Sequence, residues 1–280
     1  LKAIVEKCRA IGAEVVLATP NNVINSSGRP TDKLITYCDA VREVGQELDV
    51  PVCDSYQRLD AVRTNDAFDW RLLMSDAIHP NMDGHQRIAE QLTQTITGLR
   101  VSLANVQPAE PAIPRTLARL MDKQPIRVLA MPPYDSLIEP ALKSISPTAS
   151  VEVTVWPNEG LSVAKLQQDA SSRVRAMKPD LVLIAVPRTA TAESDEAFAD
   201  SYAWVMNWSL NFGPPTWDCV VIHPSVAEPT TEIHPRDELV RRLVAAQDLS
   251  LIDRPTGNTT EPAEIFREWI ARYANAEPNE

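Results

Sequence analysis

The sequence predicts an α/β protein in which helices cover both faces of parallel sheets. Short apolar runs alternate along the chain with segments whose apolar residues recur at helical spacing. Proline and asparagine mark the turns between several of these segments. Because parallel neighbours need crossover connections, strands that alternate with helices predict a doubly wound parallel sheet.

The first 97 residues contain two predicted strand–helix units. In chain order we expect a helix at 1–12, a strand at 15–19, a helix at 34–48, a strand at 50–53 and a helix around 88–96. Asp83 or Gly84 is expected to cap the last helix. The chain opens with Leu1 inside a helical pattern, so we expect it to be a piece of a longer protein.

Residues 98–125 lose this periodicity and contain four prolines, which predicts a linker with a short helix around 115–122. Alternation then resumes over residues 126–275. We expect strands near 126–131, 150–155, 180–186, 218–223 and 249–253, with helices near 137–146, 162–177, 195–212, 236–247 and 262–274. Five such units make one complete doubly wound domain.

An internal repeat relates the two parts of the chain. Residues 15–20 align with 219–224, and residues 49–54 align with 248–253. In each part the aligned strands are joined by a helix and followed by another helix. The first 97 residues therefore match the final two units of the fold that residues 126–275 contain whole.

Composition excludes several classes of function. The formal net charge is −11, and no cluster of Lys and Arg is present to bind nucleic acid or an anionic membrane. No apolar run reaches the roughly 18 residues that span a bilayer. The four cysteines form no Cys-x-x-Cys pair, which leaves the cellular compartment open and predicts neither a zinc ribbon nor a disulfide scaffold.

A catalytic pattern precedes the last helix of the first part. Asp76 and His79 lie three residues apart in a predicted loop, followed by Pro80. A carboxylate at this spacing can hold one imidazole nitrogen and leave the other to accept a proton from a nucleophile. In doubly wound sheets such loops follow the carboxyl ends of strands, where functional sites lie.

The motif Asp76-x-x-His79-Pro80-Asn81-x-x-Gly84-His85 resembles the last sequence block of SGNH (GDSL-type) hydrolases. The two preceding strands are similar to that family's penultimate elements. The resemblance implies a flavodoxin-like sheet and a Ser-His-Asp esterase with His79 as general base, Asp76 as its orienting partner, and neither a metal nor an organic cofactor. It also implies that the serine and the oxyanion hole precede Leu1.

The second part resembles the same fold but departs from the family's motifs. Ser136, in Asp135-Ser136-Leu137, aligns with the family's nucleophile, but Tyr134 replaces the glycine before it. We expect Ser136 to be a helix N-cap with Glu139 completing a capping box, and Gly160 to be a turn residue. The eight residues 254–261 contain no histidine, so this copy is expected to be inactive.

Other interpretations remain open. Asp76 could serve only as a loop cap, or it could join His79 and His85 in a metal site. Ser136 and Gly160 could combine with Asp76 and His79 in a composite site, which would require the second part's last two units to leave its sheet. A binding or structural module without catalysis is the alternative function, with a ligand-contacting face formed by Trp156, Trp204, Trp208 and Trp217.

The sequence thus predicts part of an SGNH-like domain (1–97), a linker (98–125) and a degenerate second copy (126–275). The expected function is hydrolysis of a carboxylic ester, with a small-molecule, carbohydrate or lipid ester as substrate. The two copies are also candidates for docking onto each other.

Overall fold

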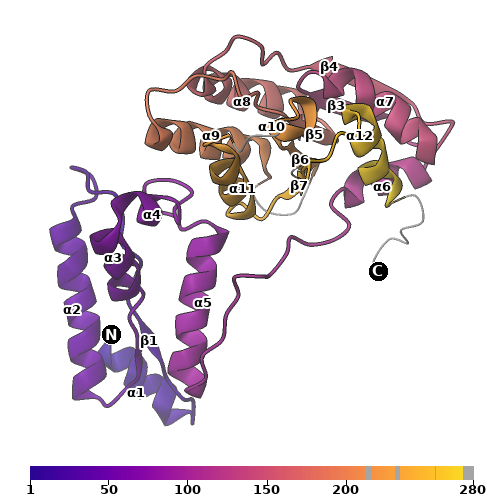
Figure 1. Ribbon diagram of the computed structural model, residues 1–280. Coiled ribbons are helices and arrows are strands. Elements are labelled where there is room, and N and C mark those ends of the chain that lie inside the picture. The colour runs from indigo at the N-terminus through magenta and orange to yellow at the C-terminus, as the bar shows by residue number, and fades with distance from the viewer. Residues whose placement is uncertain (212–215, 231–233, 256, 274–280) are drawn as a thin grey trace. The chain divides into compact units, whose positions relative to one another are not determined.

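The computed structural model describes residues 1–211, 216–230, 234–255 and 257–273 (Figure 1). Contacts between Cα atoms divide the chain into unit 1, Leu1–Val106, and unit 2, Gln107–Glu280. Each unit contains one parallel sheet. Residues 212 and 274–275, where predicted elements were expected to end, lie outside the described residues. No helix in the described ranges combines the length and apolar character needed to cross a bilayer.

Unit 1 pairs two short strands in parallel and surrounds them with helices. Its elements are α1 (Lys2–Ala10), β1 (Leu17–Ala18), α2 (Thr31–Glu47), β2 (Val52–Cys53), α3 (Ser55–Asn65), α4 (Ala67–Arg71) and α5 (Met82–Thr97). Within this unit, α2 and α5 lie on opposite sides of the strands (Figure 1). The helices α3 and α4 are additions to the predicted order, and Asp54 and Asp66 cap them by accepting backbone N–H bonds.

Two apolar clusters hold unit 1 together. The first joins α1, β1, α2 and the entry to β2 through Val5, Leu17, Val44 and Val50. The second lies under the segment that enters α5 and consists of Leu59, Trp70, Leu73 and Met74. This second cluster gives the loop after α4 a fixed apolar support.

Unit 2 contains a complete parallel sheet with the strand order β4-β3-β5-β6-β7. Its elements are α6 (Pro114–Met121), β3 (Ile126–Ala130), α7 (Tyr134–Ile145), β4 (Val151–Val155), α8 (Val163–Met177), β5 (Leu181–Ile184), α9 (Asp195–Ser209), β6 (Asp218–Ile222), α10 (Pro224–Ala227), α11 (Asp237–Ala245), β7 (Ser250–Ile252) and α12 (Pro262–Ala271). Numbered within the unit, this is the order 2-1-3-4-5 of flavodoxin-like sheets. Helices α7 and α12 contact each other on one side of the sheet, and α8 and α9 on the other (Figure 1).

The expected linker contains part of the core of unit 2. Residues 114–121 form α6, whose buried residues Thr116, Leu117 and Leu120 lie on the side that contacts β3 and β6. The Asp218 carboxylate at the start of β6 accepts a bond from the Thr116 hydroxyl at 2.7 Å. The contact boundary between the units therefore falls earlier, at Val106 and Gln107.

An arginine–aspartate pair occurs at the same place in each unit. In unit 1, Arg42 of α2 donates from Nε to Asp54 Oδ2 at 2.6 Å, just after β2. In unit 2, Arg241 of α11 donates from Nε to Asp253 Oδ2 at 2.7 Å, just after β7. Both pairs are separated by 12 residues. The aligned segments thus share a side-chain contact as well as a strand pattern.

Backbone geometry repeats in the same segments. Asp49 and Asp248 occupy aligned positions, and both adopt left-handed φ angles, 48° and 55°. Residues other than glycine seldom adopt this conformation. The aligned strands also pair in the same register, Ala18 with Cys53 and Ile222 with Ile252.

The paired arginines are expected to stabilise their units to a similar extent. Partial burial raises the pKa of Asp54 and of Asp253, but hydrogen bonds from Arg42 and Arg241 contribute to a net pKa below the ordinary value. Arg42→Ala or Arg241→Ala should therefore lower the free energy of unfolding at pH 7 by about 1 kcal/mol.

Stability from a depressed carboxyl pKa is present above the unfolded value near 4 and is lost as the pH falls below it. The difference between wild type and each variant should therefore shrink from pH 7 to pH 3 in urea unfolding. Arg87→Ala, at an exposed position of α5, is the control and should have little effect. A difference that stays constant with pH would contradict this account.

Candidate functional site

The segment between α4 and α5 forms a closed loop. Met74 and Pro80 form an antiparallel bridge, and the Ser75 N–H donates to the His79 carbonyl at 2.9 Å. The buried side chain of Met74 anchors this loop on the apolar cluster below it. The loop presents Asp76 and His79 on a closed backbone frame.

Asp76 holds both the loop backbone and the imidazole ring. Its Oδ1 accepts the N–H groups of Ile78 and His79, each at 2.8 Å. Its Oδ2 lies 2.8 Å from His79 Nδ1. One carboxylate therefore fixes the turn and the orientation of the ring together.

The His79 ring is open to solvent on its other side. Its side chain is 68% exposed, while that of Asp76 is 25% exposed. In the neutral tautomer that donates from Nδ1 to the carboxylate, Nε2 carries the free lone pair. The described residues provide no partner for Nε2. The ring can therefore accept a proton from a nucleophile that approaches from solvent.

Hydrogen bonding keeps Asp76 ionised. Partial burial raises the pKa of this carboxyl, but the bonds from the His79 ring and from the two backbone N–H groups outweigh that effect. The net pKa of Asp76 lies below its ordinary value. At neutral pH the imidazole therefore faces a carboxylate, which stabilises an imidazolium when one forms.

The loop after β1 ties the site to the sheet, a feature that the sequence analysis missed. Asn21 donates from Nδ2 to the Ile78 carbonyl at 2.9 Å, and the Ile24 N–H donates to the Ala77 carbonyl at 2.9 Å. Asn21 directly follows the Ala-Thr-Pro end of the strand, but its partner lies 57 residues away. The signal in the sequence that could have indicated this role is the position of Asn21 close to the end of a predicted strand.

The start of α5 is set by Asn81, where Asp83 or Gly84 was expected to cap. The helix begins at Met82, and the Asn81 side chain accepts the N–H of Gly84 at 3.1 Å. Asn81 also donates from Nδ2 to the Leu72 carbonyl at 2.7 Å, deep in the structure. The predicted cap was wrong because the helix starts before both expected residues.

His85 does not join Asp76 and His79. It is exposed on the first turn of α5, and among the described residues no three His, Cys, Asp or Glu side chains gather closely enough to hold a metal ion. The metal-site alternative that combined these three residues has no support in the described part of the chain.

Ser136 in unit 2 is not an N-cap. Helix α7 starts earlier than predicted, at Tyr134, with Pro133 at the N-cap position. The Ser136 hydroxyl donates back to the Pro133 carbonyl at 2.8 Å, and Glu139 pairs with Lys143. The expected capping box fails because Ser136 already lies inside the first turn.

Gly160 occupies the turn between β4 and α8. Its φ of 70° is left-handed, and open space surrounds the position where a Cβ would lie. Glycine is needed here for the backbone conformation rather than for a close approach. This is the turn role expected from the sequence.

The composite arrangement of Ser136 and Gly160 with Asp76 and His79 required the last two strands of unit 2 to leave the sheet. Strand β6 pairs with β5 and β7, so both strands occupy their places. The four proposed tryptophans do not form one face, because Trp156 and Trp217 are buried, whereas Trp204 and Trp208 are partly buried neighbours with ring centroids 5.7 Å apart.

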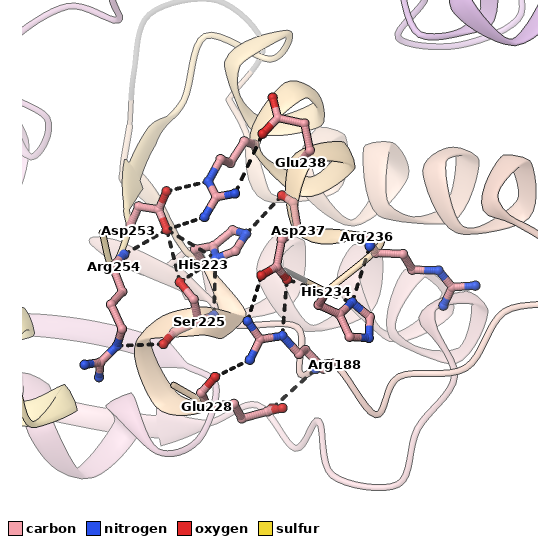
Figure 2. A network of polar contacts seen from close by, with 11 residues as sticks. Arg188, His223, Ser225, Glu228, His234, Arg236, Asp237, Glu238, Asp253 and Arg254 are labelled. Carbon is pink, nitrogen blue, oxygen red and sulfur yellow. Dashed lines mark hydrogen bonds and ion pairs between the residues drawn. The ribbon is translucent and has the colours of Figure 1, made fainter. Parts of the chain in front are cut away.

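His223 in unit 2 is a buried structural histidine (Figure 2). Its Nδ1 accepts the N–H of Ser225 at 3.2 Å, and its Nε2 lies 3.1 Å from the Asp237 carbonyl. Burial lowers the pKa of His223, and the nearby Asp253 carboxylate offsets this only in part. With both ring nitrogens occupied, His223 cannot act as a base for an external substrate.

The part of the chain that contains the Asp76–His79 loop matches a known protein family. Residues 1–87 match the GDSL-like Lipase/Acylhydrolase family. The matched part, which we term the GDSL-like segment, ends within α5 and includes both residues of the pair. Comparison with curated proteins and with solved structures gives no match.

A methyl group at Gly84 should disrupt the site loop. An added Cβ would lie 2.4 Å from the Leu73 carbonyl oxygen and 2.7 Å from Pro80 Cβ. The Leu73 carbonyl also accepts the Asn81 N–H, so this part of the backbone cannot move away without loss of a hydrogen bond. Gly84→Ala should therefore lower the free energy of unfolding by about 1–3 kcal/mol. Gly28→Ala, where nothing lies within 4 Å, should change stability little in the same urea titration. Equal effects would refute the steric argument.

The buried His223 should make unit 2 sensitive to weakly acidic pH. A lowered folded-state pKa means that the unfolded chain binds more protons below about pH 6.5, so stability is lost as the pH falls through this range. His223→Asn, which cannot titrate, should flatten the change in unfolding free energy between pH 7.5 and 5.0. Tryptophan fluorescence can follow this transition, and a His223→Asn variant with the wild-type pH dependence would contradict this account.

Proposed function

We propose that residues 1–97 are the C-terminal part of a serine acylhydrolase domain, with His79 as general base and Asp76 as its positioning partner. The observation that supports this most is the 2.8 Å contact between His79 Nδ1 and Asp76 Oδ2 on a ring whose other side is exposed. The match of the GDSL-like segment to an acylhydrolase family supports the same chemistry.

The reaction would proceed through an acyl-enzyme. A serine hydroxyl would pass its proton to His79 Nε2 as its oxygen attacks the acyl carbonyl carbon. The imidazolium, stabilised by Asp76, would return that proton to the leaving alcohol as the ester bond breaks. A water molecule, deprotonated by the same imidazole, would then release the carboxylic acid and the serine.

We expect the serine and its oxyanion-stabilising groups to lie upstream of Leu1. The open edge of β1 supports this, because β1 pairs only with β2 in the described chain. Its counterpart β6 in unit 2 pairs with a strand on each side. A further parallel strand beside β1 would complete the sheet in the way that β5 does in unit 2.

Unit 2 is proposed to be a degenerate second copy without esterase activity. The repeated Arg–Asp pair and the repeated left-handed aspartate support common ancestry of the two parts. After β7, Arg254 is buried and donates from Nε to the Ser225 carbonyl. No histidine occurs in residues 254–261, the segment of unit 2 that corresponds to the loop with His79 in unit 1.

A module without catalysis is the second candidate. Two of the three bonds made by Asp76 go to backbone N–H groups, and these would hold the loop even in a protein that hydrolyses nothing. As the substrate of an active enzyme we propose an O-acetylated carbohydrate, a lysophospholipid or a short-chain ester.

Activity of the full-length protein, including the residues upstream of Leu1, separates these candidates. With p-nitrophenyl acetate as substrate, His79→Ala should lower kcat by about 10²–10⁴-fold, since a positioned base contributes this much. Asp76→Asn keeps an oxygen for the backbone N–H groups but removes the carboxylate from Nδ1, so it should also lower kcat strongly while the protein stays folded.

His85→Ala is the matched control, because it removes an exposed histidine six residues away and should leave kcat unchanged. Labelling of the full-length protein by a fluorophosphonate should identify the serine. Turnover that survives His79→Ala would reject the esterase assignment, and absence of both turnover and labelling would favour the module.

A further inference from the structure

A pocket of about 420 Å³ opens in unit 2 at the edge of the sheet where β3, β5 and β6 begin. Arg127 lies at the start of β3, while Asp180 and Trp217 directly precede β5 and β6. This edge is opposite the carboxyl ends of the strands, where doubly wound sheets form their usual ligand crevice. The pocket is therefore a feature of this chain that the fold class does not predict.

Positive charge predominates in the lining of this pocket. Among the described residues that line it, one is a carboxylate and four are cationic, namely Arg115, Arg127, Arg175 and Lys178. The lining thus has a formal charge of +3 in a chain whose net charge is −11. The cations come from α6, β3 and the end of α8, so only the fold brings them together, around one small pocket rather than over an extended surface.

Asp180 gathers the arginines. Its side chain is 3% exposed, and Arg115 Nε and Arg127 Nε lie 3.9 Å and 3.6 Å from its carboxylate oxygens. Arg119 Nε lies 3.4 Å from the same carboxylate. Asp180 can compensate only one of these three positive charges, so the guanidinium groups beside it remain in excess.

Two helix ends reduce this charge without cancelling it. Helices α8 and α9 both end at the pocket, where Arg127 donates to the Lys178 carbonyl at 2.6 Å and Arg175 to the Leu210 carbonyl at 2.8 Å. Each helix C-terminus carries roughly half a negative charge, which lowers the local charge from +3 to about +2. The nearby Asp218 carboxylate does not line the pocket and accepts bonds from the start of α6.

Two of the cations keep donors for a ligand. The Arg115 side chain is 40% exposed, and its terminal amino groups, unlike the buried Nε, reach the surface without a partner among the described residues. Lys178 is exposed at the rim, and its ammonium group has no partner in the described part of the chain. Its flexible four-carbon stem can turn this group toward an anion in the pocket.

A phosphate group matches both the charge and the donors. A phosphate monoester has a second pKa of about 6, so it carries nearly two negative charges at pH 7.5. Its oxygens can accept charge-assisted bonds from several donors at once, whereas a carboxylate spreads a single charge over two oxygens. Arginine and lysine are the side chains that proteins use to bind phosphate.

The pocket has room for more than the phosphate group. Five heavy atoms need on the order of 150 Å³ at the roughly 30 Å³ that one water occupies, compared with about 420 Å³ in the pocket. Asn211 and Thr216 also line it, and Asn211 Oδ1 accepts the Thr216 N–H and hydroxyl. The Thr216 hydroxyl oxygen keeps its lone pairs for a donor on the ligand, which favours a small hydroxylated body.

We propose that this pocket binds the phosphate group of a small phosphate monoester with a hydroxylated body, such as a polyol phosphate. The phosphate oxygens accept bonds from the Arg115 terminal amino groups and from the Lys178 ammonium group. Arg127 and Arg175 add positive charge, and the body contacts Thr216. The proposal uses no residue of unit 1, so it does not depend on the esterase assignment.

The test titrates glycerol 3-phosphate, inorganic phosphate and acetate into the ¹⁵N-labelled 280-residue chain at pH 7.5 and fixed ionic strength. Glycerol 3-phosphate should shift the backbone amide and indole N–H signals of Trp217, with a dissociation constant of about 1 mM or below. Inorganic phosphate, which lacks the body, should bind about threefold more weakly, and acetate at least about tenfold more weakly. Lys178→Gln should weaken binding of glycerol 3-phosphate about fivefold, because it removes one charge-assisted bond.

Lys123→Gln is the matched control. Lys123 is also exposed and has a left-handed φ of 54°, compared with 48° for Lys178, so both substitutions remove one charge from the same backbone conformation. Lys123 does not line the pocket, so its variant should bind glycerol 3-phosphate as wild type does.

The absence of shifts at Trp217, equal affinity for acetate and glycerol 3-phosphate, or equal binding by the Lys178→Gln variant and wild type would each overturn the proposal. Equal weakening by the two lysine substitutions would also overturn it, because net charge alone would then explain binding. Equal affinity for inorganic phosphate and glycerol 3-phosphate would reject the ester and identify free phosphate as the ligand.

Discussion

Asp76 imposes the constraint on which the candidate site depends. One carboxylate oxygen accepts two backbone N–H groups of its own loop, and the other holds the imidazole of His79. The same carboxylate therefore sets the shape of the loop and the orientation of the ring. A change in either one would break hydrogen bonds that Asp76 makes. Bonds from Asn21 and Asn81 then place that loop against β1 and α5.

Parallel pairing explains why both units place a partly buried carboxylate just after a strand. The strand ends meet at one edge of a sheet, where helix ends, turns and backbone groups compete for partners. In each unit an aspartate at this edge accepts a hydrogen bond from an arginine of the preceding helix. In unit 1 the loop beyond this edge carries the partly buried Asp76 and the exposed His79, while in unit 2 the residue directly after the aspartate is the buried Arg254.

The sequence was most informative where partners are close along the chain. Asp76 and His79 lie three residues apart, so spacing alone predicted their contact, and apolar periodicity predicted the strands of both sheets. It failed at helix starts, because Ser136 and Gly84 have suitable neighbours but lie beyond the residue where each helix begins. It could not assign Asn21, whose partner lies 57 residues away.

By itself, the sequence determined the alternation of strands and helices and the Asp–His pair, because these depend on periodicity and on contacts within a few residues. Only the tertiary structure decided which polar groups remain unsatisfied. The hydroxyls of Tyr134 and Tyr202 are buried with no hydrogen-bond partner among the described residues, and only the packing around them decides this. Hydrogen-bond satisfaction is a property of the whole fold, and no local pattern encodes it.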